Sequence, residues 1–355
     1  MNRYLILENG SIFKGKAFGA DKEVIAEIVF TTAMTGYIET LTDKSYTGQA
    51  VVQTFPLIGN YGVISEDTES EKPRVSAYVV REWCEFPSNF RCEKTLDAYL
   101  KENDITGLYG IDTRALTKIL REHGTMNGII TDNPKVDLDK IKSYRICEPV
   151  AEVSTKEAFL VKSEKSRYTV AMLDFGKKDN ILKSLLKRDC DVWVLPYNTS
   201  PEIVMKYKPD GIFLTNGPGD PSDNKEVIEN LKKLSDEKIP TMGICLGHQL
   251  LALAHGFSTS KLKYGHRGAN QPVKNLKTGN VYISSQNHGY AVVSESIDEK
   301  IADELFININ DRTNEGLSYK NNLAFSVQFH PEACPGPKDT NFLFDDFINL
   351  MGHSR

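Results

Sequence analysis

The chain has 355 residues, of which 40% are hydrophobic and 26% are charged, and its net charge is −5. This composition is typical of a globular protein with room for two domains. The negative charge argues against a nucleic-acid or membrane-surface partner, because basic clusters usually mark such sites. No apolar run approaches the roughly 20 residues of a membrane span, and the start MNRYLILENGSIF does not have the form of a secretory signal, so we expect a cytoplasmic protein.

The first half of the chain alternates short apolar runs with glycine and asparagine turns, which predicts strands. The expected strands are 4–7, 24–30, 51–55 and 75–80. Helices are predicted at 95–101 and along IDTRALTKILRE, where Asp112 or Thr113 can cap the helix. Residues 1–150 are therefore predicted to form a mixed, strand-rich α+β domain. The polar, weakly periodic segment 151–167 is expected to be a linker.

From residue 168 onward, near-continuous apolar strands alternate with helical segments. The expected strands lie in YTVAMLDF, CDVWVLP, DGIFLTNGPGDP and IPTMGI, and the expected helices at 180–187, 202–206, 227–234 and 246–255. Shorter strands are predicted between 281 and 328, and a closing helix at 342–351. The alternation predicts an α/β domain over 168–355, with a mostly parallel, doubly wound sheet. Ligands of such sheets bind at the carboxyl ends of the strands.

Cys245 differs from the other five cysteines in its surroundings. The six are scattered, with no C-x-x-C pair and no Cys/His zinc spacing, so no metal site is expected. Cys245 lies between Gly243 and Gly247 at a strand-to-helix junction, a pattern typical of a nucleophile elbow. The N-terminus of the following helix favours a thiolate. The alternative is a buried cysteine between two packing glycines.

A thiol nucleophile needs a base, and the base needs an orienting group. The segment SVQFHPEACPGP supplies His330 and Glu332 directly after an apolar strand. His248 is a rival base, but a side chain three positions into the helix points back along its own turn, so we expect it to pack. His288, in SSQNHGYAV, is a second rival and is expected to be structural.

The loop NGPGDP, residues 216–221, is the other informative segment of the second half. Its glycines allow backbone N–H groups to approach a ligand closely, as a tetrahedral oxyanion requires. A tight turn with Pro218 at its corner explains the same residues, so the loop alone is a weak signal.

Together these segments resemble the class I, triad-type glutamine amidotransferases. The resemblance rests on three ordered motifs, Asn216-Gly217-Pro218-Gly219, GICLGHQ at 243–249, and His330-Pro331-Glu332. It implies that Cys245 is the nucleophile, His330 the acid and base, and Glu332 the group that orients His330.

Further segments narrow the family to the small, glutamine-hydrolysing chain of carbamoyl-phosphate synthase. In the first half, the similarity lies in FTTAMTGYIETLTDKSYTGQ, QTFPLIGNYG and GLYGIDTRALTKILREHGTMNGII. In the second half, it lies in DFGKKDNIL, YGHRGANQPV and SSQNHGY. This resemblance covers nearly the whole chain. The glutamine pocket that it implies consists of Ser45, Gly217, Gly219, Leu246, Gln249, Asn287, Gly289 and Tyr290. Because Ser45 belongs to the N-terminal domain, that pocket would lie at the domain interface, a common place for ligands. Without the resemblance, Ser45 is an ordinary turn residue and Tyr290 an aromatic core residue. In the implied pocket, Tyr290 is expected to contribute mainly its backbone.

The resemblance implies that L-glutamine is hydrolysed to glutamate and ammonia through a cysteinyl thioester. Ammonia would pass through a tunnel to a separate large subunit, in a heterodimer or a higher assembly contacted largely by the N-terminal domain. The large subunit would hold ATP and Mg²⁺ or K⁺ and make carbamoyl phosphate from bicarbonate, for arginine and pyrimidine biosynthesis. The present chain lacks a G-x-x-x-x-G-K-[ST] loop, and we expect no cofactor on it.

Two residues depart from the family pattern. Cys334 stands where a serine is expected and adds a second, oxidisable thiol near the site, and Asp179 replaces a usually basic residue.

Three other functions stay open: a glutaminase subunit for a different synthetase, a stand-alone thiol hydrolase or peptidase, and a non-catalytic scaffold for a large synthetase chain. The N-terminal domain argues against the first of these, and an intact set of Cys245, His330 and Glu332 argues against the scaffold.

Overall fold

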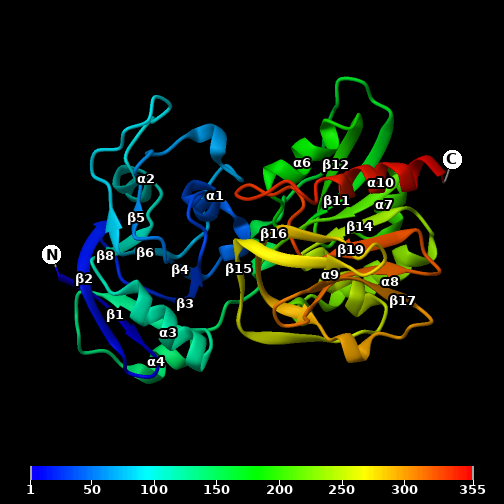
Figure 1. Ribbon diagram of the computed structural model, residues 1–355. Helices are drawn as coiled ribbons and strands as arrows, with labels where there is room; N and C mark the ends of the chain where they lie inside the picture. The colour runs from blue at the N-terminus through cyan, green and yellow to red at the C-terminus, as the bar shows by residue number, and fades with distance from the viewer. Residues whose placement is uncertain (1, 354–355) are drawn as a thin grey trace. The chain divides into compact units, whose positions relative to one another are not determined.

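The computed structural model describes residues 2–353 and divides into two compact units, one ending at Cys147 and the other beginning at Glu148 (Figure 1). In the first unit, strands close into a barrel in the order β1-β2-β8-β6-β4-β3-β9. These strands are β1 (Asn2–Leu7), β2 (Ile12–Gly19), β3 (Val24–Thr31), β4 (Gln49–Gln53), β6 (Ala77–Val80), β8 (Thr106–Tyr109) and β9 (Met126–Thr131). Buried side chains such as Val29, Val51 and Tyr78 form the core of this unit.

Short helices and a small ribbon accompany the barrel. They are α1 (Tyr37–Thr42), α2 (Leu96–Glu102), α3 (Thr113–His123), α4 (Leu138–Lys142) and the two-stranded sheet of β5 (Leu57–Ile58) and β7 (Glu82–Trp83). Helix α3 begins where the sequence predicts, and Asp112 is its cap because its carboxylate accepts a hydrogen bond from the N–H of Ala115 at 2.9 Å. Thr95 caps α2 in the same way.

The second unit contains one large mixed sheet, in the order β10-β12-β11-β13-β14-β19-β18-β17-β15-β16. Its strands are β10 (Phe159–Val161), β11 (Tyr168–Asp174), β12 (Cys190–Pro196), β13 (Gly211–Leu214), β14 (Thr241–Ile244), β15 (Thr259–Asn275), β16 (Val281–Val292), β17 (Ala302–Asn308), β18 (Asn314–Tyr319) and β19 (Ala324–Val327). The predicted parallel pairing holds from β12 to β19, and the strands beyond β19 pair antiparallel.

Helices cover both faces of the parallel strands, as the apolar strand sequences predict. Alternate residues of β11 enter opposite cores, with Val170 and Met172 in one and Ala171 and Leu173 in the other. The first core also takes residues of α6 (Asp179–Leu186) and α10 (Phe342–His353). The second takes residues of α7 (Pro201–Lys206), α8 (Lys225–Asp236) and α9 (Leu246–Ala254). Within residues 2–353, no helix has the length and apolar character needed to cross a membrane.

The segment 151–167, predicted to be a linker, contributes instead to the second unit. Helix α5 (Pro149–Val153) leads into it, and β10 pairs antiparallel with β12 at the edge of the large sheet. Val150 joins the core that α8 and α9 share. This strand could not be recognised in the sequence because three residues are too few to show a strand period.

Candidate active site

Three neighbouring strands end at the same edge of the large sheet and deliver the predicted motifs there. The order β13-β14-β19 is parallel, so their carboxyl ends lie together. Asn216–Gly219 follows β13, Cys245 follows β14, and His330 follows β19. The backbone N–H of His330 donates to the carbonyl of Ser285 at 2.9 Å, which joins this edge to strand β16.

Cys245 has the strained backbone of a nucleophile elbow, with φ 54° and ψ −105°. A non-glycine residue with positive φ is uncommon and persists only where its surroundings enforce it. The enforcement comes from the two glycines, since a Cβ at Gly247 would lie 2.4 Å from the carbonyl oxygen of Leu214. A Cβ at Gly243 would lie 2.9 Å from backbone atoms of Gly247. Cys245 is buried, and its thiol donates to the carbonyl of Asn287 at 3.7 Å.

His330 and Glu332 form a buried pair beside this sulfur. Nδ1 of His330 lies 2.6 Å from Oε1 of Glu332. Nε2 of His330 is buried and has no hydrogen-bond partner of standard geometry within residues 2–353. Burial and the Lys178 cation both lower the pKa of His330. The Glu332 carboxylate and the Cys245 side chain act in the opposite direction and raise this pKa to about 10.

Lys178 is a buried cation of the site that was not predicted from the sequence. Its Nζ lies 3.3 Å from Oε1 of Glu332 and donates to the carbonyls of Ala333 and Cys334, also at 3.3 Å. Burial alone would raise the pKa of Glu332, but His330 and Lys178 hold it below its usual value. Glu332 is therefore a carboxylate between two cations. The position of Lys178 shortly after strand β11 was the available signal, because β11 ends at the same sheet edge.

A backbone N–H group is available beside the sulfur at the start of α9. Leu246 is the first residue of that helix, so its N–H has no partner in the helical ladder. The N–H of Gly247, in contrast, donates to the carbonyl of Thr215 at 3.0 Å. A Cβ at Gly217 would lie 2.8 Å from Cδ2 of Leu246, so the loop after β13 packs directly against this helix start.

The other predicted pocket residues of the second unit cluster on α9 and β16. Nε2 of Gln249 donates to the carbonyl of Tyr290 at 2.8 Å and to Oε1 of Gln328 at 2.9 Å. Asn287 lies on β16 and its carbonyl receives the thiol of Cys245. Gly289 lies between Asn287 and Tyr290 in sequence, on the same strand. Tyr290 thus contributes its backbone carbonyl to this group of residues.

The remaining predicted and rival residues lie as follows. Ser45 belongs to the first unit, where it is buried in a short 3₁₀ turn, Lys44–Tyr46, with its N–H bonded to the Asp43 carboxylate. His248 is fully buried against Ser326 Oγ at 2.8 Å, and burial lowers its pKa to about 3. His288 is also buried, its Nδ1 bonded to the Tyr290 carbonyl.

Of the two departures from the family pattern, Asp179 is accommodated locally. It is the first residue of α6, where a negative charge is favourable, and it pairs with Lys177 Nζ at 2.7 Å. Cys334 lies in the turn that follows Glu332, and its carbonyl accepts a hydrogen bond from Lys178 Nζ.

Comparisons with known proteins cover both units. Residues 5–130 match the family model "Carbamoyl-phosphate synthase small chain, CPSase domain", and residues 171–350 match "Glutamine amidotransferase class-I". A glutamine amidotransferase from Thermotoga maritima, known as a crystal structure, is 17% identical. The alignment covers 54% of this chain and 86% of that chain, with a TM-score of 0.39.

Relatives of known name align along almost their whole length. The carbamoyl phosphate synthase small chain of Clostridium perfringens is 52% identical over 98% of this chain and 99% of its own length. The protein of the same name from Oceanobacillus iheyensis is 51% identical over 99% of this chain and 97% of its own. That from Caldanaerobacter subterraneus has the same identity and coverage. With both halves matched and the relatives covered end to end, the chain belongs to the carbamoyl-phosphate synthase small chain family.

Proposed function

We propose that this chain is the glutaminase subunit of a carbamoyl-phosphate synthase, with Cys245 as the nucleophile, His330 as the acid and base, and Glu332 as its orienting carboxylate. The single observation that carries the proposal is the geometry of Cys245. The strained backbone of Cys245, between two closely packed glycines, presents a thiol beside a buried imidazole that a carboxylate holds in place. Covalent acyl transfer requires this arrangement of nucleophile, base and orienting group.

The first step is attack of the Cys245 sulfur on the side-chain carboxamide of L-glutamine. The raised pKa of His330 keeps its imidazole protonated near neutral pH, and an adjacent imidazolium stabilises a thiolate. The positive end of α9 acts in the same direction. Negative charge that develops on the carbonyl oxygen would be met by the N–H of Leu246 and by the loop of Gly217 and Gly219.

His330 then gives its proton to the departing nitrogen, so ammonia leaves and a γ-glutamyl thioester remains on Cys245. Neutral His330 next takes a proton from water, which attacks the thioester and releases glutamate and the thiol. Glu332 accepts the Nδ1–H of His330 throughout, which fixes the tautomer with Nε2 available for transfer. No cofactor enters these steps.

The amino-acid part of the substrate is proposed to contact Gln249, Asn287, Gly289 and the backbone of Tyr290, with Ser45 as a further glutamine-binding residue on the strength of family membership. The side chain of Gln249 is already fixed through its Nε2 by Tyr290 and Gln328, so its Oε1 is the atom that it can offer to a substrate ammonium group. This pre-organisation favours binding because little freedom is lost.

Ammonia is proposed to pass to a large synthetase subunit in the cytoplasm. That partner would hold ATP and Mg²⁺ or K⁺ and complete carbamoyl phosphate for arginine and pyrimidine biosynthesis. The close relatives named as small chains support a complex of this kind, since a small chain implies a large one.

The test is release of glutamate from L-glutamine by the purified chain, alone and with a large synthetase subunit. Cys245→Ser is compared with the matched control Cys147→Ser, because Cys147 is an exposed cysteine of the first unit. We expect turnover that rises with the partner, persists in the control and is lost in Cys245→Ser. Full activity of Cys245→Ser, or failure of the wild-type chain to make glutamate with any partner, would leave the scaffold function in its place.

A further inference from the structure

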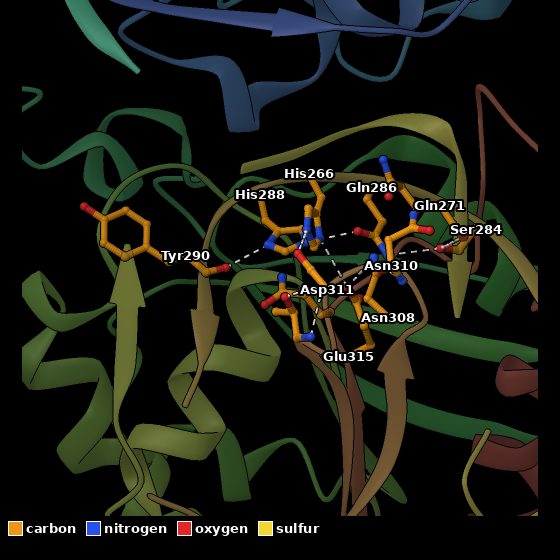
Figure 2. Close-up of polar contacts among 12 residues, drawn as sticks. His266, Gln271, Ser284, Gln286, His288, Tyr290, Asn308, Asn310, Asp311 and Glu315 are labelled. Carbon is orange, nitrogen blue, oxygen red and sulfur yellow. Dashed lines mark hydrogen bonds and ion pairs between the residues drawn. The ribbon is translucent and has the colours of Figure 1, made fainter. Parts of the chain in front are cut away.

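A second polar cluster lies in the antiparallel part of the large sheet (Figure 2). His266 on β15 and His288 on β16 are direct partners across the strand ladder, so their side chains share one face. Glu315 projects to the same place from β18. The possible ligand atoms of these three residues lie within 4.8 Å of one another. Three strands of one sheet therefore hold two imidazoles and a carboxylate together.

Each imidazole is oriented by a hydrogen bond on its far nitrogen. Nε2 of His266 lies 2.7 Å from Oδ2 of Asp311, and Nδ1 of His288 lies 2.8 Å from the carbonyl of Tyr290. A carboxylate or backbone carbonyl in this place is what metal-binding histidines characteristically have, because it fixes the ring and directs the other nitrogen to the metal. The remaining nitrogens are Nδ1 of His266, which lies 3.3 Å from Oε1 of Glu315, and Nε2 of His288, which lies 3.2 Å from Oε1 of Gln286.

One acceptor at the cluster lacks a donor. Oε2 of Glu315 is buried and has no hydrogen-bond partner within residues 2–353, whereas Oε1 of Glu315 lies 3.3 Å from Nδ1 of His266. Because the Nδ1–H of His288 donates to the carbonyl of Tyr290, the Nε2 of this ring is an acceptor. That acceptor faces another oxygen, Oε1 of Gln286, at 3.2 Å. Buried acceptors that face one another are costly unless a cation lies among them.

We propose that His266, His288 and Glu315 bind a divalent transition-metal ion of the zinc class, with Oε1 of Gln286 as an additional oxygen ligand. Two imidazoles and one carboxylate suit zinc and its neighbours, whereas magnesium and calcium prefer oxygen alone. Nδ1 of His266 and Oε1 of Glu315 are 3.3 Å apart, close to the ~3.3 Å edge of a tetrahedral ion with bonds of about 2.0–2.1 Å. His266 otherwise shares a proton with the carboxylates of Asp311 and Glu315. When the metal ion binds, this proton is released to solvent.

The ion would stiffen the strand that borders the triad. Strand β16 carries His288 and also Asn287, whose carbonyl receives the Cys245 thiol. The carbonyl of Tyr290 is shared by His288 and Gln249, so a fixed His288 also fixes the anchor of Gln249. The site is structural, and its existence does not depend on the proposed glutaminase activity.

The experiment measures zinc retained by the full-length chain after addition of Zn²⁺ and removal of the excess by dialysis, with elemental analysis. It is done in the Cys245→Ser background, because the Cys245 thiol could bind zinc itself. We expect one equivalent to be retained there, to be lost when Glu315→Gln is added, and to persist with Asp303→Asn. Asp303 is a matched control because it is an exposed carboxylate on β17 of the same sheet.

A second readout needs no change in the cluster, and so does not depend on whether Glu315→Gln folds. Co²⁺ added to the Cys245→Ser chain should give the visible bands of a tetrahedral nitrogen and oxygen site, without the near-ultraviolet band of cobalt bound to thiolate. The proposal is overturned if Cys245→Ser retains no zinc, if Glu315→Gln and Asp303→Asn retain equal amounts, or if the cobalt spectrum shows thiolate ligation. In those cases the cluster is a proton-bridged ion pair alone.

Discussion

Replacing Glu332 with glutamine should move the alkaline limit of glutaminase activity to lower pH. Glutamine keeps the shape and can still accept the Nδ1–H of His330, so the ring keeps its orientation while the negative charge is lost. In the native chain the pKa of His330 is about 10, because Glu332 and Cys245 outweigh burial and Lys178, which both lower it. Without the Glu332 charge the lowering effects dominate, so His330 loses its proton at a lower pH.

The size of the shift follows from the contact. An opposite charge within hydrogen-bonding distance of a buried group typically changes a pKa by about 1–3 units, which corresponds to about 1.4–4 kcal/mol. The 2.6 Å distance and the burial of both side chains place this pair among close, poorly screened contacts. We therefore expect the alkaline limb of the kcat profile to fall by roughly one to three pH units.

The assay is initial-rate glutamate formation between about pH 6 and about pH 10.5, with kcat and kcat/KM fitted separately. Glu164→Gln is the matched control, because Glu164 is exposed and belongs to the same unit. Circular dichroism of each variant shows whether it is folded, since Lys178 keeps its two carbonyl partners but loses its carboxylate. An alkaline limb that stays at the wild-type pH in a folded Glu332→Gln chain would refute the assignment of that limb to His330.

Four further substitutions test neighbouring parts of the site. Lys178→Met removes a cation that lowers the pKa of His330, so the alkaline limb should move up in pH, opposite to Glu332→Gln. At the alkaline end of the same rate profile, this variant should therefore keep its activity where that of wild type falls. His330→Asn should lower kcat by roughly 10²–10⁴-fold. His248→Asn removes a neutral ring that is bonded to Ser326, so it should lower the melting temperature and leave turnover close to wild type. Steady-state kinetics and thermal denaturation distinguish these two outcomes. Gly247→Ala places a Cβ 2.4 Å from the Leu214 carbonyl. Overpacking of that kind costs about 1–3 kcal/mol, so a melting temperature equal to wild type would contradict the elbow geometry.

The features that were predictable from sequence are local ones. The elbow at Cys245 could be predicted because a strand, two glycines and a helix occupy a few consecutive residues, and the H-P-E segment places imidazole and carboxylate two positions apart. The cap at Asp112 is likewise a matter of three residues. The α/β class of the second half was predictable because its parallel strands are apolar on both faces.

Features that depend on distant segments were not predictable. Lys178 reaches the site only because the turn after β19 folds over the end of β11, 155 residues away in sequence. The barrel of the first unit pairs β1 with β9, from opposite ends of that unit, and no pattern within either strand encodes the partner. The pairing of His266 with His288 depends on register shifts on both sides of it in β15, which the sequence does not reveal.

The closed barrel of the first unit also limits how another protein can attach to it. Each of its strands, from β1 around to β9 and back, has a neighbour on both sides. A closed barrel has no free row of backbone donors and acceptors, so a visiting chain cannot extend it by adding a strand. Recognition of the barrel must therefore use side chains and connecting loops, such as the one that exposes Phe86 and Phe90. Substitutions in those loops can then change partner choice while the hydrogen bonds of the barrel stay as they are.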